Sequence, residues 1–260
     1  MPKKSTQKLH PAIPELKLQL DRGELDRREF LRTTTLLGLS ATAAYAMAGI
    51  SPRQRAVAQD GPKPKRGGNL RVGMAVKEIT DPATYDWSEK GNIARQVIEP
   101  LVQIGADNVA RPYLLEKWQP SEDLKTWTFH LRKGVTWSIG DTFNADDVVF
   151  NVNRWLDPRT GSSNQARFAA MTNEVEEVDA KGKTVIRRTP TTGAVEKIDD
   201  HTVRFHLNRP ELALPEGMAD YPALIVHRRF SDDGGNFAKN PVGTGPFALK
   251  SFAVGDKSVL

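Results

Sequence analysis

The chain has 260 residues, no cysteine and a formal net charge of +5, a size that allows one or two domains with a sizeable core. The lack of cysteine excludes disulfides, thiol catalysis and cysteine-ligated metal. Residues 1–58 carry 10 Lys and Arg against 5 Asp and Glu, whereas residues 59–260 carry 27 of each. Because the body has no net charge, electrostatics give no argument for nucleic acid, and we predict no such partner.

The basic excess of residues 1–58 has the pattern of an export signal. Paired arginines are followed by Phe-Leu and a further basic residue, which resembles a twin-arginine motif: Arg27, Arg28, Phe30, Leu31 and Arg32. Residues 33–50 contain no charge but are only weakly apolar, which is typical of a twin-arginine signal. We therefore predict a signal peptide over residues 1–58, read by the twin-arginine export machinery.

The end of this signal is predicted from small residues. Ala56 and Ala58 form a small-x-small site, so we expect cleavage between Ala58 and Gln59. Similar sites at residues 44–46 and 46–48 remain open alternatives. An uncleaved anchor is another, since the 18 residues of 33–50 are at the lower limit for a membrane span. After cleavage the protein would be a soluble protein of the periplasm.

The body begins with a flexible lead-in, residues 59–66, which contains Pro62 and Pro64. Apolar residues alternate over residues 69–76 and predict a first strand. An Asp-Pro loop at residues 80–85 interrupts the pattern. A short helix is then predicted up to Ile98, ended by Pro100.

The most informative stretch is residues 114–155. Trp127, Phe129 and Leu131 alternate with polar residues, which predicts a strand with one buried face. A turn and a short strand at residues 135–137 follow. Asn144 is placed to cap a helix whose first turn holds Asp146 and Asp147, where the helix dipole favours negative charge.

The remaining elements are shorter. Two hairpins are predicted, one joining residues 174–178 to 184–188 and the other joining 195–198 to 203–207. We expect short helices over residues 165–171 and 211–219. A short buried strand is expected at 223–227, and another strand is expected to begin at 247–252.

Three pieces of this pattern resemble family 5 of the extracellular solute-binding proteins, the peptide, nickel and oligopeptide receptors of ABC importers. The first is the signature that runs through residues 115–118, 127–135, 137–141 and 143–148. The others are Ile-Asp-Asp-His-Thr-Val at residues 198–203 and Asn-Pro-Val-Gly-Thr-Gly-Pro-Phe at 240–247. The similarity covers residues 67–260 in order.

The resemblance implies a mixed α/β, α+β-like fold of the type II periplasmic binding proteins. Residues 67–94 and 223–260 would belong to the first lobe, and residues 95–222 would form the extra subdomain of the family. Because the receptors are about twice as long, we expect the second lobe to lie outside this chain. This N-terminal half, a fragment, is expected to bind solute very weakly or not at all on its own.

The function implied by the resemblance is capture of a peptide or related small solute for a membrane permease, with the two lobes closing over it. The ligand-facing positions would be Thr80, Asp81 and Pro82 in the loop after the first strand, and the aromatic residues Trp137 and Phe150. An ordinary Asp-Pro turn and ordinary core packing are the competing interpretations. The resemblance leaves peptide, nickel complex, opine and oligosaccharide open as the solute.

Catalytic chemistry finds little support in the residues. The Asp pairs at 146–147, 199–200 and 232–233 lie at predicted helix starts or turns, where Asp serves in capping. His201 and His206 would point to opposite faces of a strand, so no zinc pattern arises. We predict no catalytic residue, metal or cofactor, and not an enzyme. The alternatives are a periplasmic enzyme exported by the twin-arginine route and a solute sensor for a chemoreceptor.

Overall fold

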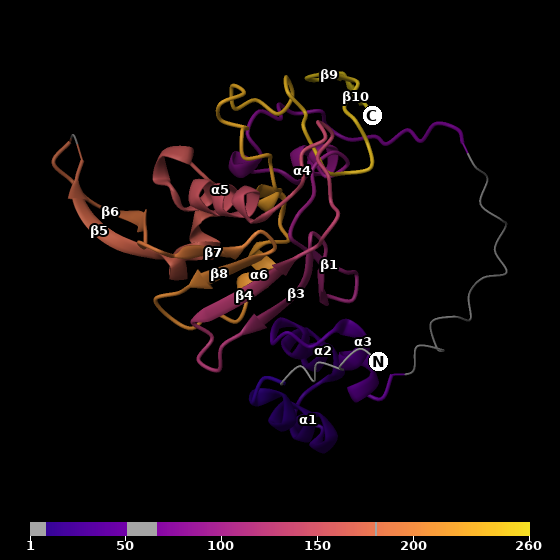
Figure 1. Cartoon of the computed structure of the whole chain (residues 1–260), viewed down its shortest axis with the longest axis vertical. Coiled ribbons are helices and arrows are strands. Elements are labelled where there is room, and N and C mark those ends of the chain that lie inside the picture. Colours follow the sequence, from indigo (N-terminus) through magenta and orange to yellow (C-terminus); the bar gives the residue numbers. More distant parts are fainter. Residues whose placement is uncertain (1–8, 51–66, 180) are drawn as a thin grey trace.

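The computed structural model describes residues 9–50, 67–179 and 181–260. Figure 1 shows three N-terminal helices below a body built around a sheet, with the C-terminal segment at the far end of that body. The three helices are α1 (Ala12–Arg22), α2 (Arg27–Leu36) and α3 (Ala41–Met47). Among the described residues, no helix combines the length and the apolar character needed to cross a membrane.

The centre of the body is a four-stranded antiparallel sheet in the order β3-β4-β8-β7. Its strands are β3 (Leu115–Pro120), β4 (Thr126–Leu131), β7 (Val195–Asp199) and β8 (Thr202–His206). The alternation predicted for β4 is confirmed, since Trp127, Phe129 and Leu131 are all buried. The rings of Phe129 and Phe205 lie 4.8 Å apart on the inner face, so neighbouring strands share one apolar layer.

Helix α5 (Ala145–Leu156) packs against β7 and β8. Its predicted start is confirmed: Asn144 and Asp147 form a capping box, in which each side chain accepts a backbone N–H at the other end of the first turn. The buried side chains Val148, Val152 and Trp155 are spaced along one side of the helix, so this side covers the sheet.

Two predicted hairpins are also confirmed, one as β7–β8 and the other as β5 (Thr172–Val178) with β6 (Thr184–Pro190). The β5–β6 hairpin projects from the body on the left of Figure 1. The remaining short elements are α4 (Ser88–Ala94), α6 (Leu214–Gly217), β1 (Val102–Ile104), β2 (Ala110–Pro112), β9 (Ser251–Ala253), β10 (Lys257–Val259), and the 3₁₀ turns Pro82–Thr84, Pro158–Thr160, Gln165–Met171 and Tyr221–Ala223.

Several short predictions are wrong in detail. Residues 69–76 form no strand and no strand pairing with any described residue, and Leu70 is 91% exposed. A strand requires a partner for its backbone groups, and here the Gly255 N–H to Val76 O bond supplies one contact. Residues 135–137 are reduced to a bridge from Thr136 to Thr142. Residues 223–227 are buried, with one bridge formed at Leu224.

The buried apolar side chains form separate cores. The largest lies between the sheet and α5 and contains Trp118, Trp127, Phe129, Trp155 and Phe205. A second core joins residues 79–98 to residues 224–237 and includes Tyr85, Ile98, Val226, Phe230 and Phe237. The segments before and after the sheet, residues 79–98 and 224–237, therefore pack against each other and form the second core together.

Candidate functional site

The loop that follows residues 69–76 is held by Asp81. Its carboxylate accepts the backbone N–H of Ala83 at 3.0 Å, which caps the 3₁₀ turn Pro82–Thr84. The same carboxylate forms an ion pair with Arg154 of α5. Thr80 is half-buried, and its carbonyl accepts the N–H of Phe237 at 2.7 Å. The loop is thus fixed to both the helix and the C-terminal segment.

Phe150 lies in the same region as Asp81, since Arg154 contacts both side chains. It is half-buried against the second core. The Arg154 guanidinium lies 5.5 Å from the Phe150 ring and 4.9 Å from the Phe230 ring, distances at which a cation is attracted by an aromatic face. We did not predict Arg154, although its spacing of four from Phe150 on a helix was a usable signal.

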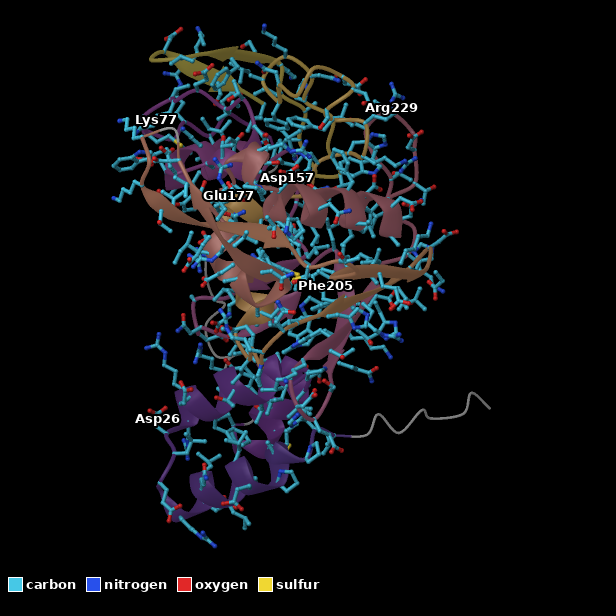
Figure 2. The ribbon with its side chains drawn as sticks, turned by 90° about the vertical axis from the view of Figure 1, so that its left-hand side faces the viewer. Asp26, Lys77, Asp157, Glu177, Phe205 and Arg229 are labelled. Atoms are coloured by element: carbon cyan, nitrogen blue, oxygen red, sulfur yellow. The ribbon has the colours of Figure 1, made fainter. Side chains whose placement is uncertain are left out.

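Exposed groups lie next to this loop. The Lys77 ammonium sits 3.7 Å from the centre of the Trp87 ring, and Trp87 is largely exposed. Figure 2 labels Lys77 on the body, at the opposite end of the molecule from Asp26. An exposed aromatic beside a fixed loop offers a flat apolar surface to a ligand, and the sequence pattern alone gave no reason to select Trp87.

Pro82 and Trp137 lie deeper than the other predicted site residues. Pro82 is buried beneath its turn, and Trp137 is only 2% exposed. The Trp137 indole N–H donates to the Asp147 carboxylate at 3.1 Å, and its ring meets that of His227 edge-on at 5.1 Å. Trp137 therefore belongs to the large buried core, whereas Phe150 packs against the second core.

Asp147 is the centre of a buried polar cluster, which we call the Asp147 clasp. Its Oδ1 accepts the backbone N–H of Arg228 at 3.1 Å and that residue's guanidinium at 3.2 Å. Its Oδ2 accepts the indole of Trp137 and the N–H of Asn144 at 3.0 Å. A fully buried carboxylate is stable only when paired and hydrogen-bonded, so the clasp holds the returning chain at residues 226–228 against the start of α5.

Tyr85 lies beneath the same loop, and its hydroxyl is unusual. Burial, with a further contribution from the Asp81 carboxylate, raises the pKa of Tyr85 well above its usual range. Within the described residues its Oη has no hydrogen-bond partner. We therefore expect Tyr85→Phe to leave the free energy of unfolding unchanged or to raise it by up to ~1 kcal/mol, because the unsatisfied hydroxyl is removed. Urea denaturation measures this, and a loss above ~1 kcal/mol would reveal a partner for the hydroxyl.

The paired aspartates have structural roles, as predicted. Asp147 belongs to the capping box and the Asp199 carboxylate accepts the N–H of His201 in a turn. Asp233 pairs with Arg229, four residues earlier in a turn. Within residues 9–50, 67–179 and 181–260, no group of three His, Asp or Glu side chains is placed to hold a metal ion.

The predicted export motif lies at the start of α2. Asp26 caps the helix by accepting the N–H of Glu29 at 2.9 Å, and Arg27 and Arg28 are exposed on its first turn. Phe30 and Leu31, by contrast, are buried. The predicted cleavage residues Ala58 and Gln59 lie outside the described residues.

Similarity to solved structures defines the class of protein. The Escherichia coli murein tripeptide binding protein MppA superposes with a TM-score of 0.58 and 27% identity, over 71% of this chain and 36% of that chain. Haemophilus influenzae OppA, solved with the peptide RPPGFSPFR, gives 0.57 and 26%, over the same shares of the two chains. The fold is that of the type II periplasmic binding proteins.

The family follows from the sequence. Residues 110–260, more than half of the chain, match the family model described as bacterial extracellular solute-binding proteins, family 5, middle region. The Escherichia coli dipeptide-binding protein is 32% identical over 83% of this chain and 38% of its own length. Haemophilus influenzae OppA, a periplasmic oligopeptide-binding protein, is 29% identical over 70% and 34%. This chain belongs to family 5 of the bacterial extracellular solute-binding proteins, and it spans about a third of the length of these curated relatives.

Proposed function

We propose that this chain contributes to the substrate-binding component of an ABC importer, which captures peptides or a related small solute in the periplasm. Membership of family 5 carries the proposal. The printed names of relatives specify dipeptides, di- and tripeptides, and oligopeptides, which favours a peptide as the solute. The partner on the membrane would be the permease of that importer.

We infer that Thr80, Asp81 and Phe150 face the solute, whereas Pro82 and Trp137 are buried and pack within the body. The fixed loop, its ion pair with Arg154 and the nearby exposed Trp87 support this assignment. The one charged side chain of the loop, Asp81, is already paired with Arg154, which suits a pre-formed binding surface more than acid–base catalysis. A binding protein rather than an enzyme is therefore the preferred function, and turnover of a bound solute would contradict it.

The mechanism we infer is closure of two lobes about a hinge. Residues 67–94 with 223–260 would form first-lobe segments, and residues 95–222 the extra subdomain. The second core, built by the flanking segments, and the separate core of the sheet support this division. Residues 1–58 would act as a twin-arginine signal, cleaved between Ala58 and Gln59.

The test uses the protein recovered from the periplasm of its source. Native mass spectrometry should show a bound solute of peptide mass that is lost on denaturation. In calorimetry with that solute, Phe150→Leu should raise Kd about tenfold, because an aromatic contact within reach of the ligand is lost. Phe252→Leu is the matched control, since Phe252 packs against the same core. Equal Kd values for the two variants would remove Phe150 from the site.

A further inference from the structure

The N-terminal helices are seated on the body through apolar contacts. Phe30, Leu31, Ala44 and Ala48 form one cluster with Val109, which precedes β2. Leu36, at the end of α2, is fully buried and belongs to the large core of the body. Figure 1 shows these helices against the side of the body that carries β3. A segment that shares a core with the body is bound to it by the hydrophobic effect.

Three polar contacts fix the orientation of the N-terminal helices on the body. The Arg32 guanidinium donates to both oxygens of Glu216, at 2.7 and 2.9 Å, a bidentate geometry that is specific as well as strong. The buried Trp118 indole N–H donates to the carbonyl of Leu36 at 3.0 Å. Tyr45 donates to the Asp107 carboxylate, which also pairs with Arg111.

The chain after α2 approaches the body at backbone distance. Gly38 has φ of +89°, and a Cβ placed there would lie 2.7 Å from the carbonyl oxygen of Trp118. Only glycine fits both the left-handed conformation and this approach. The contact surface between the N-terminal helices and the body is therefore complementary in shape as well as in charge.

In this docked state one part of the predicted export motif is exposed and the other part is buried. Arg27 and Arg28 point to solvent on the first turn of α2, whereas Phe30 and Leu31 are buried. The body-side partners Val109, Trp118 and Glu216 come from segments more than 90 residues apart at the extremes, so they meet only after the body has folded. If residues 1–58 are the signal peptide, or leader, the docked state exposes the two arginines of the motif and buries its Phe-Leu pair.

We propose that the folded body docks its own leader and hides Phe30 and Leu31, so that α2 must detach before the export machinery can read the motif. This inference rests on the proposed twin-arginine export of the chain. A cavity of about 980 Å³ lies beside the Arg32–Glu216 pair and is lined also by Glu29, Arg95 and Arg167. The two paired side chains are 31% and 25% exposed, so solvent can reach the ion pair. Detachment can therefore begin at its polar side.

The first experiment measures docking in the full chain by amide hydrogen exchange over residues 27–48. Glu216→Lys places like charges together and should speed exchange there at least tenfold. Glu176→Lys is the matched control, because it makes the same charge change on the exposed β5–β6 hairpin. The double variant Arg32→Glu with Glu216→Arg should restore slow exchange, which separates loss of the ion pair from misfolding. Unchanged exchange in Glu216→Lys would overturn the docking.

The second experiment measures export of the same chains from the cytoplasm. Glu216→Lys should be exported at least threefold faster than the parent chain at early times, and Glu176→Lys at the parent rate. If Glu216→Lys undocks the leader without changing export, masking is wrong. Arg27→Lys with Arg28→Lys should abolish export. Normal export of that double variant would reject the twin-arginine route, and with it the masking role, whatever the exchange data show of docking.

Discussion

Replacing Asp147 by alanine is expected to lower the free energy of unfolding by about 3–5 kcal/mol, because it removes the acceptor of an entire buried cluster. Asp147 is 0% exposed, and its two oxygens accept from Trp137, from the backbone of Asn144, and from both the backbone and the guanidinium of Arg228. Each buried donor left without an acceptor costs about 1–3 kcal/mol. Urea denaturation followed by tryptophan fluorescence measures the loss.

Asp146 supplies the matched control from the same helical turn. Its side chain is half exposed and pairs with Lys197 on the neighbouring strand. Asp146→Ala removes a surface ion pair and a favourable charge near the helix start, so a loss of about 1 kcal/mol or less is expected. Similar losses for the two variants would mean that the helix start, and not the clasp, is the source of the stability.

The contrast between Asp146 and Asp147 shows what the sequence could predict. The cap at Asn144 and the acidic first turn were predictable because capping depends on neighbours three residues apart. The sequence does not distinguish Asp146 from Asp147, since both lie in the first helical turn, where the helix dipole favours negative charge. Their difference comes from Arg228, which lies 81 residues away along the chain, and no local pattern predicts that contact.

Some of the strands could likewise be predicted from local sequence, and one could not. β4 and the two hairpins were predictable because each turn signal and each alternating pattern lies within a few residues of its strand. Residues 69–76 have an equally good alternation, yet they pair with no described strand. Alternation reports how side chains are distributed between two faces, but it says nothing about whether a neighbouring backbone is present.

The candidate site was only partly predictable for the same physical reason. The family resemblance selected Asp81 and Phe150, and the structure brings both to the Arg154 side chain. The resemblance favoured Phe150 over Trp137 as a ligand contact, but it could not predict that Trp137 is buried, because it does not show which segment covers each ring. Burial is decided by which segment lies above each ring, and for Trp137 that segment includes His227.

The second large effect is expected at Gly243, in the turn Gly-Thr-Gly-Pro of residues 243–246. A Cβ at Gly243 would lie 1.8 Å from the carbonyl oxygen of Val97, far inside contact distance. That carbonyl accepts the N–H of Gly245 at 2.8 Å, and the Gly243 carbonyl accepts the N–H of Ser138 at 2.8 Å. Gly243→Ala must therefore displace two backbone segments and their hydrogen bonds together.

We expect Gly243→Ala to lower the free energy of unfolding by about 3 kcal/mol, at the upper end of the usual cost of overpacking, because the obstacle is backbone that no rotamer change relieves. Gly73→Ala is the control, since nothing lies within 4 Å of its added Cβ, and a change within about 0.5 kcal/mol is expected there. If Gly243→Ala were equally neutral, the turn would have to tolerate a shifted backbone. Residues 243–246 could then not be the rigid connection that fixes the C-terminal segment to Val97 and Ser138.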